Sequence, residues 1–161
     1  MIRELTGDIL LSKAEVIAHG VAPHDHFDSG LALALRERWP VMVKDFRHYC
    51  HLHNPKPGGL WAWAGPGARI VNLLTQDPAP NAHAKPRKAT LPNVNHCLRE
   101  LRHFVDREQV GSIALPRLAT GFGGLAWEEV KELIDHHLAD LKIPVFLYTH
   151  YERDRAAAEQ G

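Results

Sequence analysis

The chain has 161 residues, a length that suits one folded domain with its own hydrophobic core. Hydrophobic residues make up 45% and charged residues 24% of the chain, and 19 Lys plus Arg balance 19 Asp plus Glu, which excludes a strongly basic general nucleic-acid binder. The two cysteines, Cys50 and Cys97, cannot build a disulfide framework and fit no metal-ligand spacing, which predicts reduced thiols in a cytoplasmic protein. No apolar run approaches about 18 residues, so we expect neither a signal peptide nor a membrane span.

In the first half of the chain, short apolar runs alternate with segments of helical spacing. The run 2–5 predicts a strand, and the apolar residues after Glu15 predict a buried strand over 15–21. Asp28 or Ser29 can cap the helix that follows, because short polar side chains accept hydrogen bonds from the free N–H groups of a helix start. The other elements expected in this half are helices over 30–38 and 41–52 and a hairpin with strands over 60–64 and 69–75.

The second half opens with a loop over 77–88 that is rich in Pro and Ala. Apolar side chains at helical spacing then predict a helix over 90–107, and a second apolar stripe predicts a helix over 127–141. The remaining elements expected here are a short buried strand, a glycine-rich loop, a last strand and a frayed polar tail, over 112–115, 119–125, 145–148 and 152–161.

Alternating strands and helices predict a sheet with helices packed on both of its faces. The hairpin adds an antiparallel strand, so the central sheet should be mixed rather than purely parallel. We therefore expect a three-layer α/β/α sandwich, formed by a single domain over 1–151 and followed by the polar tail 152–161.

Two loops that join a buried strand to a helix carry residue types suited to phosphate. They are the segment 26–31, His-Phe-Asp-Ser-Gly-Leu, and the glycine-rich segment 119–125. Open α/β sheets bind ligands where the carboxyl ends of strands meet helix N-termini, whose free N–H groups and positive dipole attract anions. Glycines at such positions also serve simple helix entry. Neither loop matches the P-loop or the Rossmann fingerprint, so the sequence does not support those two kinds of nucleotide site.

Several motifs, in their order along the chain, resemble a known family. They are Gly7-Asp8-Ile9, the strand 16–19, Ser29-Gly30-Leu31-Ala32 and the run 115–121. Together they look like a macrodomain over residues 2–150. The stretches 70–75 and 118–128 are similar to the branch that holds the terminal ADP-ribose glycohydrolase and the antitoxins that clear ADP-ribose from DNA. The resemblance implies a macrodomain fold with a cleft for ADP-ribose.

The resemblance also implies roles for individual residues. Asp8 would accept a hydrogen bond from the adenine amino group, although the residues alone also allow Asp8 to be only a turn or cap residue. Each loop would wrap one phosphate, and Tyr148 or His150 would cover the adenine face. Phe122 would pack against the distal ribose or the phosphates, unless it is a hydrophobic plug. The implied ligand-binding set is Asp8, Ile9, His19, Ser29, Gly30, Leu31, Thr75, Gln76, Ala119, Thr120, Gly121, Phe122, Gly123, Gly124, Leu125, Tyr148 and His150.

Two residues depart from the glycohydrolase branch. That branch uses a lysine nucleophile directly after the Leu-Thr strand end, where this chain has Gln76, and an aspartate where this chain has Gly123. An amide cannot form the Schiff-base adduct of a lysine amine, and glycine supplies no base. The covalent mechanism is therefore not expected, unless Lys85 or Lys88 of the following loop reaches back.

The first loop offers another catalytic possibility. Asp28 or His26 would lie near the distal ribose and could orient or deprotonate a water. Other macrodomains hydrolyse ADP-ribosyl esters or O-acetyl-ADP-ribose with little more than a positioned water. His24, Asp25, His26 and Asp28 could instead bind a metal. The sequence shows no further strong ligand elsewhere, so we expect no metal and no cofactor.

The expected function is binding of ADP-ribose or of an ADP-ribosylated macromolecule by a cytoplasmic monomer. Whether the protein also hydrolyses ADP-ribosyl or O-acetyl-ADP-ribose esters stays open, as do the modified target and the bond cleaved. The alternative, from another class, is a nucleic-acid-binding module that uses the basic segment 85–102 with Lys85, Arg87, Lys88, Arg99 and Arg102.

Overall fold

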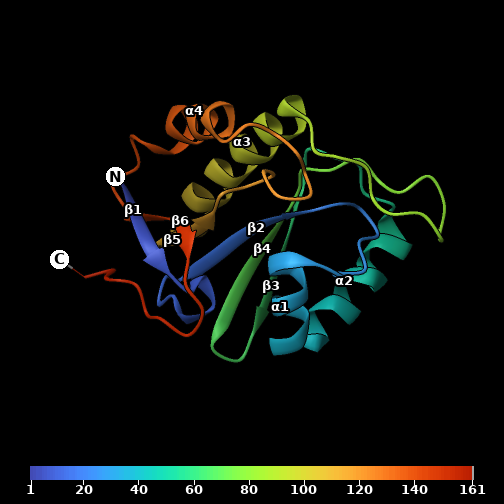
Figure 1. The fold of residues 1–161 in the computed structure, drawn as a ribbon, viewed down its shortest axis with the longest axis horizontal. Helices are drawn as coiled ribbons and strands as arrows, with labels where there is room; N and C mark the ends of the chain where they lie inside the picture. The colour runs from blue at the N-terminus through green and yellow to red at the C-terminus, as the bar shows by residue number, and fades with distance from the viewer. Residues whose placement is uncertain (161) are drawn as a thin grey trace.

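Six strands form one mixed sheet in the computed structural model, which describes residues 1–160 (Figure 1). The strand order is β1-β6-β5-β2-β4-β3, and all neighbours are parallel except β3 and β4, which form the expected hairpin. The strands are β1 Ile2–Gly7, β2 Val16–Val21, β3 Leu60–Gly65, β4 Ala68–Leu74, β5 Ile113–Pro116 and β6 Val145–Tyr151.

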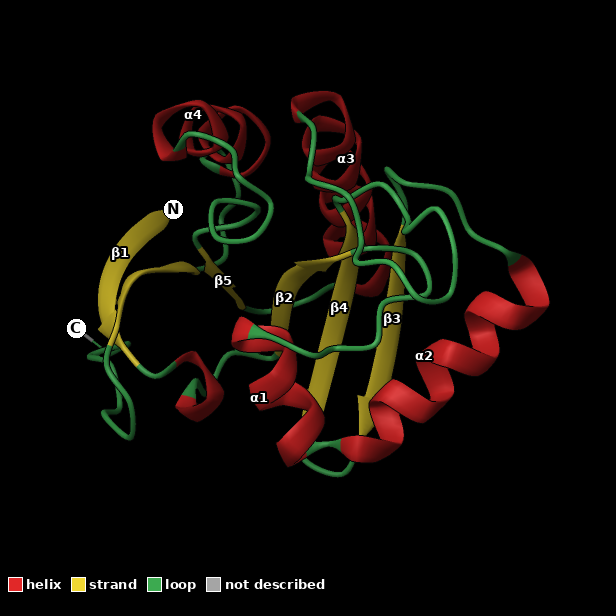
Figure 2. Ribbon diagram, turned by 45° about the vertical axis from the view of Figure 1, so that its right-hand side comes forward, coloured by secondary structure: helices red, strands yellow, loops and turns green. Residues whose placement is uncertain are grey.

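Helices cover both faces of this sheet (Figure 2). α3 Leu91–Glu108 and α4 Trp127–Leu138 lie side by side on one face, and α1 Gly30–Arg38 and α2 Pro40–His53 lie on the other. A single 3-10 turn, η1 Ile9–Leu11, follows β1. The fold prediction of a three-layer α/β/α sandwich with a mixed sheet is thus confirmed. No helix within residues 1–160 is long and apolar enough to cross a membrane.

The hydrophobic core has three parts. The largest lies between the sheet and α3 with α4, and the second lies between the sheet and α1 with α2. The third is smaller and includes Ile9, Phe146 and Tyr148, with Ala157 packed against it. Here η1 and the C-terminal segment cover the sheet, together with Leu31 at the start of α1.

Most predicted boundaries shift by a few residues, and two shifts have clear causes. β6 continues to Tyr151 instead of ending at 148, because it stays paired with β1 up to the Gly7–Tyr151 pair. α4 ends at Leu138 instead of 141, because the chain makes a tight turn there in which the Leu141 N–H donates to the Leu138 carbonyl at 3.1 Å. α1 spans Gly30–Arg38 as predicted.

The C-terminal segment, defined as residues 152–160, is not frayed, contrary to expectation. It turns back after β6 and passes beside the end of β1 and η1 (Figure 1). The Asp8 N–H donates to the Arg155 carbonyl at 2.7 Å, and the Tyr148 hydroxyl donates to the Glu159 carboxylate at 2.6 Å. Its polar composition suggested fraying, yet polar contacts are what hold it. Residue 161 lies outside the described residues.

Candidate ligand-binding site

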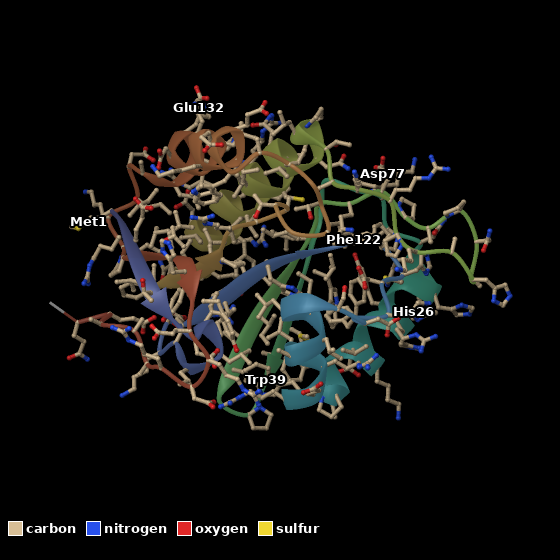
Figure 3. All side chains as sticks on the ribbon, in the orientation of Figure 1. Met1, His26, Trp39, Asp77, Phe122 and Glu132 are labelled. Atoms are coloured by element: carbon tan, nitrogen blue, oxygen red, sulfur yellow. The ribbon has the colours of Figure 1, made fainter. Side chains whose placement is uncertain are left out.

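The two predicted loops meet at one pocket of about 590 Å³, where β2 and β5 end. Figure 3 labels one residue from each loop, His26 and Phe122, near this end of the sheet. The loop between β4 and α3 supplies a third wall through residues 82–86. The predicted site residues that line the pocket are His19, His26, Asp28, Ser29, Gly30, Leu31, Gln76, Ala119, Gly121, Phe122 and Gly123.

Asp25 and Phe27 determine the shape of the first loop. The Asp25 carboxylate accepts hydrogen bonds from the Ala22 and Phe27 N–H groups, at 3.0 and 2.8 Å, which closes a tight polar turn. Phe27 has a left-handed backbone, with φ 58°, and its fully buried ring packs edge-on against His19 and Phe46. This anchored ring holds the following residues against the pocket.

The start of α1 lacks a side-chain cap. Ser29 is its N-cap residue but makes no capping hydrogen bond, and Asp28 instead forms an ion pair with Arg36 at 2.8 Å. Arg36 also donates to the His26 carbonyl at 3.2 Å. The expectation that Asp28 or Ser29 caps the helix through its side chain is therefore wrong. Among residues 1–160, no side chain therefore caps the first N–H groups of α1, which adjoin the pocket.

The acidic side chains of the first loop and the His24 ring are engaged by other groups of the protein. Asp25 and Asp28 are engaged by backbone N–H groups and by Arg36, and the His24 ring pairs with Asn54 at 3.1 Å. Within residues 1–160, no three His, Cys, Asp or Glu side chains gather closely enough to hold a metal ion. The metal alternative for this loop therefore has no support in the geometry.

The second loop is a tight turn that cannot hold a side chain at residue 123. The Ala119 carbonyl accepts from the Leu125 N–H at 3.0 Å, and Ala119 itself has φ 61°. A Cβ on Gly123 would lie 2.5 Å from the Ala119 carbonyl oxygen, closer than real Cβ contacts come. Gly121 differs, because a Cβ there would have no atom within 4 Å. The backbone is thus accessible at Gly121, which we call open backbone, whereas the turn leaves no room for a side chain at Gly123.

Phe122 lies on the rim of the pocket. Its side chain is 51% exposed, so the alternative that it plugs the core is wrong. An exposed aromatic ring beside a pocket is available to pack against a sugar or a base.

His19 lies in the pocket floor and is held neutral. Burial lowers the pKa of His19 to about 4, although the bond to Asn72 and the nearby Asp25 charge both act in the opposite direction. The Asn72 amide nitrogen donates to the Trp61 carbonyl at 3.3 Å, so its oxygen accepts from His19 Nε2 at 2.6 Å. This arrangement assigns the proton to Nε2 and leaves Nδ1 as an acceptor.

Gln76 ties the loop between β4 and α3 to the end of the sheet. It is buried, lines the pocket and donates from its side-chain amide to the Arg87 carbonyl at 3.1 Å. Lys85 lines the pocket as well. The side chain of Lys88 lies beside the second loop. A Cβ on Gly124 would be 3.2 Å from the Cδ of Lys88.

The predicted adenine-binding residues lie outside this pocket. Asp8 caps η1 by accepting from the Leu10 N–H at 3.0 Å, and its second oxygen accepts from the Asp154 N–H at 3.0 Å. Ile9 and Tyr148 are buried in the third core cluster, and His150 is exposed. Burial, followed by the hydrogen bond to Glu159, raises the pKa of the Tyr148 phenol.

Four other predicted residues also lie outside the pocket lining: Thr75, Thr120, Gly124 and Leu125. The Thr75 hydroxyl is sealed against Gly20 and has no hydrogen-bond partner within residues 1–160. Sequence reasoning missed Arg36, although a basic residue two helical turns after the polar helix start was a usable signal. It named Lys85 as a residue that could reach the site but missed the other residues of the wall 82–86.

No family model matches the sequence. Among relatives, a DNA ADP-ribosyl glycohydrolase of Thermus aquaticus is 27% identical over 161 residues, covering 97% of this chain and 43% of the relative. A DNA ADP-ribosyl glycohydrolase of Mycobacterium tuberculosis is 26% identical over 137 residues, covering 82% of this chain and 37% of the relative. The chain therefore spans less than half the length of these relatives.

Solved structures give the same picture of the fold. The macrodomain of Thermus aquaticus DarG superposes with a TM-score of 0.79 at 24% identity, covering 92% of this chain and 98% of that one. The macrodomain of Mycobacterium tuberculosis DarG superposes with a TM-score of 0.81 at 23% identity, covering 92% of this chain and 97% of that one. Thermosipho africanus DarTG in complex with ADP-ribose gives 0.79 at 18% identity, covering 96% of this chain and 42% of that one. The chain therefore has the fold of a macrodomain, and its sequence is similar to part of those of DNA ADP-ribosyl glycohydrolases.

Proposed function

We propose that this protein binds ADP-ribose, free or attached to a macromolecule, in the pocket between its two strand-to-helix loops. The observation that carries the proposal is the convergence of both loops on one pocket of about 590 Å³. A volume in this range is typical of small-molecule sites. The start of α1, which has no side-chain cap, and the open backbone at Gly121 both suit a diphosphate.

The comparisons support this ligand. A relative of this chain is named a DNA ADP-ribosyl glycohydrolase, and a structural neighbour was solved in complex with ADP-ribose. In our proposal the diphosphate lies between Gly30 and Gly121. The distal ribose lies between Phe122 and the first loop, and the adenine extends toward Asp8.

We further propose that any turnover is hydrolysis by water. The water oxygen bonds to the anomeric carbon of the distal ribose, the bond to the target breaks, and the target leaves with a proton. Asp28 or His26, both in the pocket wall, would orient the water and accept its proton. Gln76 at the position of the branch's lysine nucleophile supports this route over a covalent one, because an amide forms no Schiff base.

Arg102 disfavours the alternative of a nucleic-acid-binding module over 85–102. It binds Asp140 at 2.6 Å and Asp106 at 3.3 Å and donates to the His137 carbonyl, all on the α3–α4 side of the sheet. Lys85, by contrast, lines the pocket at the other end of the basic segment. The basic residues of the segment are thus divided between two places. We also infer that the protein is a cytoplasmic monomer, which suits its two free, buried cysteines.

The test is calorimetry of the whole chain with ADP-ribose, with an unmodified oligonucleotide as the competing ligand. We expect saturable one-to-one binding of ADP-ribose and no comparable binding of the oligonucleotide. Incubation with ADP-ribosylated DNA and with ADP-ribosylated protein then identifies the target class. Binding of the oligonucleotide without binding of ADP-ribose would reject the proposal and restore the alternative.

A further inference from the structure

The C-terminal segment makes a paired set of backbone hydrogen bonds with Asp8. The Asp154 N–H donates to the Asp8 carboxylate at 3.0 Å, and the Arg155 carbonyl accepts from the Asp8 N–H at 2.7 Å. The segment therefore presents one donor and one acceptor side by side. Adenine presents the same pair, an amino donor next to a ring nitrogen acceptor.

A second set of contacts fixes the far end of the segment through Glu159. Its carboxylate accepts from the Ser12 hydroxyl at 2.6 Å, the Lys13 N–H at 2.9 Å and the Tyr148 hydroxyl at 2.6 Å. Arg3 donates to the backbone carbonyl of Glu159, also at 2.6 Å. Glu159 is thus the side chain that binds the segment to η1 and β6.

Between these two anchors the segment lies directly on the end of β1. A Cβ on Gly7 would be 2.9 Å from both the Ala157 Cβ and the Arg155 carbonyl oxygen. Asp8 is only 4% exposed and Tyr148 only 5% exposed. A purine cannot reach either side chain while the segment is in place.

We propose that the segment 152–160 is an intramolecular competitor for adenine, which ADP-ribose must displace to reach Asp8 and Tyr148. This inference rests on the proposed function, because it assumes that ADP-ribose is the ligand. The same residues that would recognise the adenine are the ones that hold the segment. The affinity for adenine-containing ligands is therefore reduced by the fraction of molecules in which the segment is closed.

The segment is built to be displaced. Residues 152–160 form neither helix nor strand, and Ala157 is the one apolar side chain in the segment that packs against a core cluster. The Arg153 and Asp154 side chains are exposed, and Asp154 has a left-handed backbone, with φ 62°. Polar contacts of this kind exchange readily with water or ligand, whereas a buried apolar helix would not.

The test compares the full chain with its Glu159→Ala variant, which loses three hydrogen bonds without altering the pocket or Asp8. Glu132→Ala, an exposed position on α4, is the matched control. Calorimetry should show ADP-ribose and AMP binding roughly tenfold more tightly to Glu159→Ala than to the unaltered chain. Ribose 5-phosphate, which lacks the base, should bind all three proteins equally.

The outcomes separate the two hypotheses. Equal ADP-ribose affinity in all three proteins would overturn the competitor and leave the proposed function intact, whereas no binding of ADP-ribose by any of them would overturn both. If Glu159→Ala does not fold, hydrogen exchange on the unaltered chain decides. Saturating ADP-ribose should then speed exchange of the Asp154 amide, and continued protection of that amide would overturn the competitor.

Discussion

The two halves of the proposed ligand site are in opposite states. The half between the first and second loops is an open pocket, with an uncapped helix start and exposed backbone at Gly121. The half at Asp8 is filled, because the C-terminal segment takes its hydrogen bonds. A site at the ends of strands can therefore be preorganised for phosphate and ribose and yet closed to the base.

The largest effect should come from a negative charge in the open half. Gly121→Glu places a carboxylate beside the proposed diphosphate, and like-charge contacts cost several kcal/mol, so ADP-ribose affinity should fall on the order of 100-fold or more. The melting temperature should hardly change, because a Cβ at Gly121 meets no atom within 4 Å. Gly121→Ala, which adds bulk without charge, should lose far less. Tight binding by Gly121→Glu would remove the second loop from the site.

The next largest effect concerns stability in acid. The folded pKa of His19, about 4, lies below its unfolded value of about 6.5, so the unfolded chain binds the proton first as the pH falls. The stability present above pH 6.5 is therefore lost progressively toward pH 4, by about 3 kcal/mol. Denaturant unfolding across this range should show the loss in the native chain and in His48→Gln, whose histidine is exposed, but not in His19→Gln. The same dependence of the unfolding free energy on pH in all three proteins would contradict this prediction.

Asp28→Ala tests chemistry against binding within the open half. Any turnover should fall on the order of 100-fold, the size of a lost general base, while ADP-ribose binding stays within a few fold. Single-turnover kinetics and calorimetry measure the two separately. Borohydride should trap no lysyl adduct, and a reducible adduct on Lys85 or Lys88 would restore a covalent mechanism. Full activity in Asp28→Ala, with no adduct, would leave water positioned by backbone and substrate alone.

The smallest effect is expected at the filled half. Asp8→Ala removes a charged hydrogen bond to adenine, a loss of about 1.5–3 kcal/mol, but it also removes the Asp154 contact that holds the competing segment. The observed weakening should therefore lie at or below the lower end of that range. When Asp8→Ala is added to the Glu159→Ala variant, the affinity should fall by the larger amount relative to Glu159→Ala alone. The segment is already open in both of these proteins, so only the contact with adenine is lost. If the double variant binds ADP-ribose as tightly as Glu159→Ala alone, Asp8 is not part of the site.

Local patterns predicted the open half of the site and could not predict the filled half. Strand-loop-helix alternation placed both loops at one sheet end, because parallel strands share their carboxyl edge. The turn η1 was missed, since it is three residues long and depends on the Asp8 cap rather than on apolar spacing. The position of the C-terminal segment depends on partners more than 140 residues away in the chain, such as Asp8 for Asp154. No local periodicity carries that information.

Gly123 has a consequence for attempts to engineer this protein. Placing a lysine at Gln76 and an aspartate at Gly123 would match the side chains of the glycohydrolase branch, but the second change meets the Ala119 carbonyl at 2.5 Å. The whole turn from Ala119 to Leu125 would have to adopt another path first. Transplanting that turn as a unit is therefore the workable design, and point substitution is not. The path of the main chain around Gly123, and not only the side chains at positions 76 and 123, therefore separates this protein from that branch.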